Sequence, residues 1–231
     1  MSFIILLFTG FAQLTLAADS RTLIVNGDCQ RRVSQDRVSV TISAEFLESN
    51  ATTASSKATQ QYNQLRDKIK KLNLKDAEFS TSEYSLNEDF EWIKNIQKSK
   101  GFRARQSLTV ETSDLNKIGE ALKIAQELGI KRVSGLNTFV SQELFKSERE
   151  ACLEEAFKNA KSKADRLAKV SNSKVGPVIE MNESGTQTPE FQGARYKRMD
   201  MVAEASLSSA PSIDSKSEMI QTSLRVIFQI L

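Results

Sequence analysis

Two cysteines are the residues of this chain with the clearest potential for chemistry. Cys29 and Cys152 are the only thiols in the 231 residues. In an oxidising compartment the pair could form a disulfide, which would contribute about 4–5 kcal/mol in the entropic model. The alternative is that Cys152 is a small buried residue, as free cysteines often are. Because the pair has no spacing motif, the sequence favours the free buried thiol and leaves the disulfide as the alternative.

A group of basic side chains has the composition of an anion-binding site, and Trp92 and Phe102 lie close to it in the sequence. Its ligand would be lipopolysaccharide, anionic lipid or nucleic acid. The alternative, which the pattern favours, is a charged hairpin whose lysines prevent pairing with other chains. The members of the group are Lys94, Lys98, Lys100, Arg103 and Arg105.

Four glutamates gather near the start of a predicted helix: Glu148, Glu150, Glu154 and Glu155. Carboxylates are favoured at that end of a helix by its dipole, and this explains the cluster without catalysis. Glu148 and Glu155 are two helical turns apart, so a paired-carboxylate site is geometrically possible, but no other residue pattern supports one.

Most catalytic arrangements are excluded by composition. The chain has 0 histidines, which excludes histidine bases and histidine-bound metals. It also lacks a phosphate-binding glycine loop, a CxxC pair and a nucleophile elbow. We therefore expect a protein that is not an enzyme and that binds no cofactor or metal. With 39% hydrophobic residues and a net charge of +3, it is an ordinary globular chain, and we expect no nucleic acid as partner.

The N-terminus has the pattern of an export signal. Phe3 to Leu16 is an apolar run, followed by the small residues Ala17 and Ala18. This predicts a signal peptide over residues 1–18 and an exported chain over 19–231, located in the periplasm with outer-membrane association as an option. A buried strand or a membrane anchor is the alternative, but a spanning helix needs about 20 apolar residues. Residues 1–2 lack the usual basic charge, and no later segment is apolar enough to cross a membrane.

The remaining chain alternates between the strand period and the helix period. Strands are predicted at 21–26, 38–46, 79–96, 102–110, 133–140, 175–181 and 220–230, with a turn at 99–101. Pro177 marks an edge strand, and the regular last strand should lie centrally in its sheet.

Three helices are predicted between these strands. The first, 54–72, is capped by Thr52 or Thr53, and the second, 115–128, by Ser113 or Asp114, with Gly129 at its end. The third begins with a capping box at Ser147 and Glu150, and small residues form a stripe along it: Cys152, Ala156, Ala160 and Ala164, followed by Leu167. Residues 182–217 have no periodicity and predict a long, mobile surface loop before the last strand. The fold class is thus α+β, with a mixed, largely antiparallel sheet and three helices packed on it.

In this order of elements the chain resembles the SIMPL-domain family, which includes periplasmic immunogenic and oxidative-stress-defence proteins of Gram-negative bacteria. At three turn positions it departs from the family pattern: Cys29 replaces a second glycine, Gln35 replaces a proline, and a Pro-Gly is absent near residues 215–218. The patterns that carry the resemblance are Thr22 to Gly27, Tyr84-Ser85-Leu86, Gly101-Phe102-Arg103-Ala104, Asp114-Leu115 through Gly129, Val133-Ser134-Gly135 with Phe139, and Arg149, Leu153, Ala156, Ala160 and Ala164.

The resemblance implies an α+β fold, export to the periplasm, a link to envelope or oxidative-stress protection, and assembly into rings or channels, and it implies no biochemical activity. We therefore expect a homo-oligomer larger than a dimer. The alternative is a binding module that holds an anionic envelope component with its basic hairpin.

Overall fold

The computed structural model describes residues 21–184 and 213–231. The predicted signal peptide, 1–18, and residues 185–212 of the predicted loop lie outside the described residues. The loop is shorter than the predicted range 182–217, because the strand before it continues to residue 184 and the strand after it begins at residue 217. In chain order the elements are β1 (Thr22–Ser34), β2 (Arg37–Glu48), α1 (Ala51–Lys70), β3 (Glu78–Ile93), β4 (Ile96–Thr112), α2 (Ile118–Glu127), β5 (Arg132–Phe139), α3 (Gln142–Val170), β6 (Val175–Ser184) and β7 (Ser217–Ile230).

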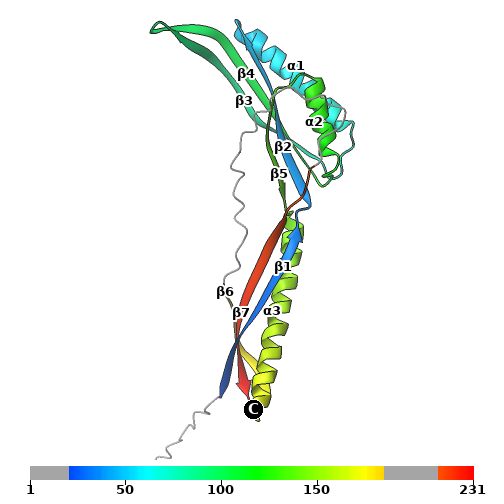
Figure 1. Cartoon of the computed structure of the whole chain (residues 1–231), viewed down its shortest axis with the longest axis vertical. Helices are drawn as coiled ribbons and strands as arrows, with labels where there is room; N and C mark the ends of the chain where they lie inside the picture. Colours follow the sequence, from blue (N-terminus) through cyan, green and yellow to red (C-terminus); the bar gives the residue numbers. More distant parts are fainter. Residues whose placement is uncertain (1–20, 185–212) are drawn as a thin grey trace, which may run out of the picture.

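The predicted α+β class is confirmed, and the strands divide between two antiparallel sheets (Figure 1). One sheet has the order β3-β4-β2-β5 and carries α1 and α2; we call this half the head. The other has the order β1-β7-β6 and carries α3; we call it the stalk. Head and stalk follow one another along the length of a narrow molecule. As predicted, β7 is central in its sheet and β6, which contains Pro177, is an edge strand.

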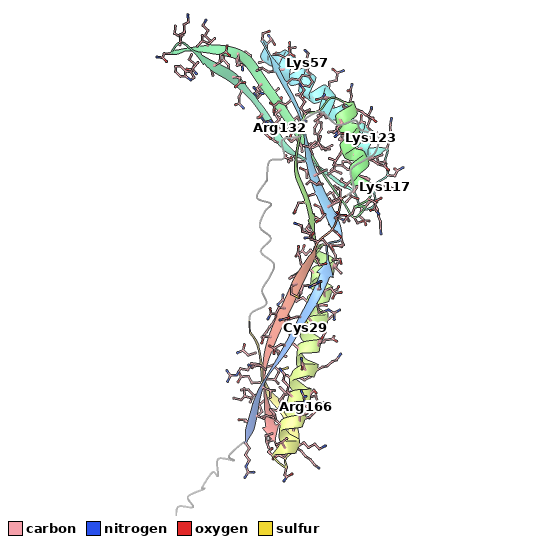
Figure 2. All side chains as sticks on the ribbon, in the orientation of Figure 1. Cys29, Lys57, Lys117, Lys123, Arg132 and Arg166 are labelled. Atoms are coloured by element: carbon pink, nitrogen blue, oxygen red, sulfur yellow. A yellow bond between two sulfur atoms is a disulfide. The ribbon has the colours of Figure 1, made fainter. Side chains whose placement is uncertain are left out.

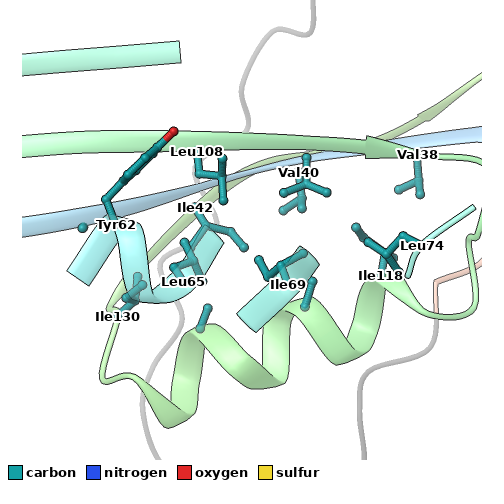
Figure 3. Packing of buried hydrophobic residues seen from close by; sticks show 14 residues of the cluster. Val38, Val40, Ile42, Tyr62, Leu65, Ile69, Leu74, Leu108, Ile118 and Ile130 are labelled. Carbon is teal, nitrogen blue, oxygen red and sulfur yellow. The ribbon is translucent and has the colours of Figure 1, made fainter. Parts of the chain in front are cut away.

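The core of the head forms between β2, β4 and the two helices (Figure 3). Val40 and Ile42 point from β2 toward Leu65 and Ile69 of α1, and all four are fully buried. Val38 of β2 is also fully buried and lies beside Leu74 and Ile118. Each such side chain contributes about 1.5–3 kcal/mol on burial. The alternating apolar side chains of β2 therefore pack against the apolar side of α1 on one face of the sheet, as the sequence predicts.

Two of the predicted helix starts in the head are wrong. Asn50, rather than Thr52 or Thr53, caps α1, because its side-chain oxygen accepts from the backbone N–H groups of both threonines. Residues 114–117 form a turn, so α2 begins only at Ile118 and has no side-chain cap. In that turn the hydroxyl of Thr112 accepts from the N–H of Asp114, which ends β4 before the helix starts.

The stalk depends on close contact between β1 and α3. The small-residue stripe predicted for this helix is buried against the sheet, and Ala168 continues it in place of Leu167, which is exposed. β1 does not end at Asn26 as predicted but continues through Gly27, whose missing side chain makes room for α3. The helix also begins earlier than predicted, at Gln142, because Ser141 accepts from the N–H of Leu144; Ser147 lies inside the helix.

Gln35 and Asp36 join β1 to β2 and fix the stalk to the head. The side chain of Gln35 donates to Glu218 in the stalk at 2.8 Å and accepts from Thr138 in the head. A carboxylate oxygen of Asp36 accepts from the N–H of Ser141, just before α3, at 2.6 Å. These two adjacent side chains therefore contact β7, β5 and the residue before α3. Gln35 and Asp36 stand where the family pattern has Pro-Asp.

Candidate functional site

The β3–β4 hairpin turns at Lys94 and Asn95, which both have positive φ angles, 50° and 62°. Two consecutive residues of this kind form the two-residue turn that suits the twist of a hairpin. The predicted turn at 99–101 is wrong because Gly101 lies in a β-bulge, with Asp89 opposite it and Phe90 opposite Ser99. Its φ is 116°, and a Cβ there would lie 2.4 Å from the carbonyl oxygen of Glu48.

The outer part of this hairpin projects beyond the rest of the head (Figure 1). β2 ends at Glu48, which pairs with Phe102, so residues 89–101 continue as a two-stranded ribbon; we call them the arm. Four large apolar side chains of the arm are exposed: Phe90, Trp92, Ile93 and Ile96. Trp92 is 71% exposed and Ile96 62%. Phe90 and Trp92 lie on one face of the ribbon, whereas Ile93 and Ile96, which pair directly, lie on the other. Exposed apolar side chains on both faces of a projecting ribbon mark an interaction surface.

The five predicted basic residues do not form one patch. Arg103 and Arg105 lie below the arm and both bind Glu45, which also contacts Arg132 at 3.3 Å. Arg103 also binds Asp89, and Arg105 binds Glu83 at 3.1 Å. The charges of both arginines are therefore neutralised by carboxylates from β2 and β3. Figure 2 places Arg132 on the same sheet of the head.

The other three, Lys94, Lys98 and Lys100, lie in the arm together with two carboxylates, Asp89 and Glu91. Glu91 pairs directly with Lys98 across the two strands. The arm is thus nearly balanced in charge, which weakens its case as an anion-binding site.

The Glu45 cluster predicts a dependence of stability on pH. Burial acts to raise the pKa of Glu45, but hydrogen bonds from Arg105 and Arg103 outweigh it and lower the pKa below the ordinary value of 4.5. A lowered pKa means that this stabilisation is complete above the ordinary value and is lost as the pH falls through the folded-state value. Glu45→Gln should lower the free energy of unfolding at neutral pH by about 2 kcal/mol.

Urea unfolding at neutral pH and at about pH 3 measures this effect. The wild type should lose more stability between the two conditions than Glu45→Gln does. Glu88→Gln, at an exposed glutamate of β3, serves as the matched control and should resemble the wild type. Identical pH profiles for the wild type and Glu45→Gln would contradict the assignment.

Two hollows of the head carry polar groups. One, of about 470 Å³, is lined by Thr41, Ser43, Ser82, Glu83, Ser107, Arg132 and Ser134. Ser43 and Ser107 hydrogen-bond one another at 2.7 Å there. The other, of about 570 Å³, lies at the junction, where Arg37 binds Glu111 at 2.8 Å and Glu78 at 3.3 Å. Within residues 21–184 and 213–231, no group of three acidic or cysteine side chains is placed to hold a metal ion.

A family model matches residues 23–228, a range that extends from β1 into β7, and is described as SIMPL, protein of unknown function (DUF541). The chain belongs to the SIMPL family. The resemblance read from the sequence is therefore confirmed. No curated protein matches the chain. In the described part of this SIMPL protein no helix is long and apolar enough to span a membrane.

In this SIMPL protein Cys29 and Cys152 form a disulfide that joins β1 to α3, and Figure 2 places Cys29 in the stalk. The Cα atoms are 5.5 Å apart although 123 residues separate the cysteines in sequence. The favoured interpretation, a free thiol at Cys152 in the core, is wrong, although Cys152 is buried as it required. The pair could not be found from spacing because the partners come from two elements that meet only in the fold.

Two of the four predicted glutamates of α3, Glu148 and Glu155, bind a residue of the neighbouring strand. Arg31 of β1 binds Glu148 at 2.7 Å and Glu155 at 3.2 Å, so the two carboxylates predicted to share a face clamp an arginine. Their hydrogen bonds raise the pKa of Arg31. Because α3 begins at Gln142, these residues lie beyond its first turn, and the helix-dipole explanation given for them is replaced by ion pairing between strand and helix.

Proposed function

We propose that this SIMPL protein is exported to the periplasm, catalyses no reaction and serves as a structural component of the cell envelope by assembling with further copies of itself. The apolar run at residues 3–16 and the disulfide support the exported location, because disulfides persist in oxidising compartments. The observation that carries the assembly proposal is the arm with its four exposed apolar side chains.

A second copy is the partner that the arm fits best. Covering a large apolar side chain contributes about 1.5–3 kcal/mol, so four of them supply a substantial part of a binding energy. The near balance of charge in the arm favours neither a strongly acidic nor a strongly basic partner. The small-residue stripe of α3 contributes nothing to assembly, since it is buried inside the stalk.

The kind of assembly that we propose is a head-to-tail contact between copies. The arm points away from its own core and is therefore free to reach a different surface on the next copy. Repeated contacts of this kind produce rings when the rotation closes, and hence oligomers larger than a dimer. A stable contact should bury more than roughly 1,000 Å², which requires surfaces beside the four side chains.

Light scattering coupled to gel filtration of residues 19–231 tests the proposal. The wild type should have the mass of several chains, and Trp92→Ser/Ile96→Ser should shift it to a monomer, since it removes the two most exposed apolar side chains of the arm. Ile179→Ser/Met181→Ser, which removes two exposed apolar side chains from β6, is the matched control and should keep the wild-type mass. A wild type that remains monomeric at all concentrations and salt conditions would reject the assembly.

A further inference from the structure

The end of the stalk farthest from the arm is formed by four chain segments that meet there (Figure 1). The carbonyl of Arg21, before β1, accepts from the N–H of Ile230 at 2.8 Å. Lys174, before β6, exchanges two backbone hydrogen bonds with Leu231, at 2.9 and 3.0 Å. The C-terminal turn of α3 joins them through Ala168, whose carbonyl accepts from the N–H of Ser173 at 2.9 Å. We call this region the stalk end.

The stalk end combines exposed aliphatic side chains with positive charge. Val170 is 86% exposed, Leu231 67% and Leu167 52%. Four cations belong to the segments that meet here: Arg21, Arg166, Lys169 and Lys174. Asp165, one helical turn before Lys169, carries the opposite charge. Figure 2 places Arg166 near this end of α3.

These cations differ from the two arginines below the arm in their partners. Arg103 and Arg105 are held by carboxylates, whereas the four cations of the stalk end make no ion pair within the part of the chain that the structure describes. Among the described residues, Arg166 donates only to the backbone carbonyl of Ser162. The three lysines of the arm likewise make no ion pair with a described residue, so positive charge that is available for an anionic partner lies at both ends of the molecule and is more numerous at the stalk end, with four cations against three.

We propose that the stalk end docks on the surface of an anionic lipid bilayer. Val170, Leu231 and Leu167 would enter the headgroup layer while the four cations bind lipid phosphates, the combination that holds peripheral proteins at an interface. In the sequence the predicted signal peptide, residues 1–18, ends shortly before Arg21 of the stalk end. The arm lies at the opposite end of the molecule (Figure 1).

Co-sedimentation of residues 19–231 with lipid vesicles tests the docking. The wild type should bind vesicles that contain phosphatidylglycerol, release them as salt is raised, and bind pure phosphatidylcholine vesicles far more weakly. Lys169→Glu/Lys174→Glu should lower the partition coefficient by at least about 30-fold, because each cation near the surface contributes about fivefold. Both side chains are at the surface, so the fold should be unaffected.

Lys94→Glu/Lys98→Glu changes the net charge by the same amount at the arm and is the matched control, with an expected loss below about threefold. Trp92 is the only tryptophan of the chain and lies in the arm, so its fluorescence should be unchanged by vesicles. The proposal is overturned by equal losses in the two variants, by a blue shift of Trp92 on vesicle binding, or by a wild type that does not bind anionic vesicles. Oligomer mass without lipid is a separate measurement, so failure of the docking leaves the assembly proposal standing.

Discussion

Removing the disulfide is expected to lower the free energy of unfolding by about 4–5 kcal/mol. The bond closes a loop across 123 residues and thereby restricts the unfolded chain, which is where the entropic model places most of its effect. Because both cysteines are buried between β1 and α3, the loss should first release the contact between these two elements. Urea unfolding of Cys29→Ala/Cys152→Ala against the oxidised wild type measures it.

Reduced wild-type protein is the control for this experiment, because it loses the bond without losing any atoms from the core. It should unfold close to the midpoint of Cys29→Ala/Cys152→Ala, and a reductant should leave the midpoint of that variant unchanged. A difference below about 1 kcal/mol between the oxidised and reduced wild type would show that the bond adds little to the contacts already made in the stalk. A large difference would mean that the stalk depends on an oxidising compartment, in support of export.

Local patterns in the sequence were sufficient to predict the elements whose buried side chains recur at a regular spacing and the turns that need a particular residue type. The alternation over 220–230 predicts a strand with one buried face, because a period of two puts every second side chain on the same face, and β7 has this burial pattern. The predicted central position of β7 is confirmed as well. Pro177 predicts an edge strand because proline cannot donate to a neighbouring strand. Gly129 has a φ of 71° after α2, as predicted for a glycine that ends a helix.

Features that depend on distant partners could not be predicted. The basic residues of 94–105 have the composition of an anion site, but Glu45, which lies 58 residues before Arg103, neutralises two of them. The cysteine pair has no spacing signal for the same reason. Glycine was also a misleading guide to the hairpin turn, because the bulge at Gly101 needs a positive φ as much as a turn does, and Lys94 and Asn95 form the turn without it.

Gly27→Ala is expected to destabilise the stalk by about 3 kcal/mol or more, a large effect for a single methyl group. A Cβ at this position would lie 1.9 Å from the carbonyl oxygen of Ala156 and 2.8 Å from the Cβ of Ala160. These are atoms of a helix backbone and of a side chain that cannot rotate away, so α3 would have to move off the sheet. Thermal and urea unfolding of the variant measure the loss.

Asn26→Ala is the matched control, because Asn26 is the neighbouring residue of β1, its side chain is exposed, and it should change stability by less than about 0.5 kcal/mol. Gly27 and the alanines of α3 together allow the strand and the helix to approach closely, because neither surface carries a large side chain at the contact. If Gly27→Ala were neutral, the helix would have room to shift, and the tight fit of the stripe could not be the reason for its small residues. A large loss would instead show that the stripe is fully used inside the monomer, so that the arm and the stalk end stay the surfaces that we propose for contact with partners.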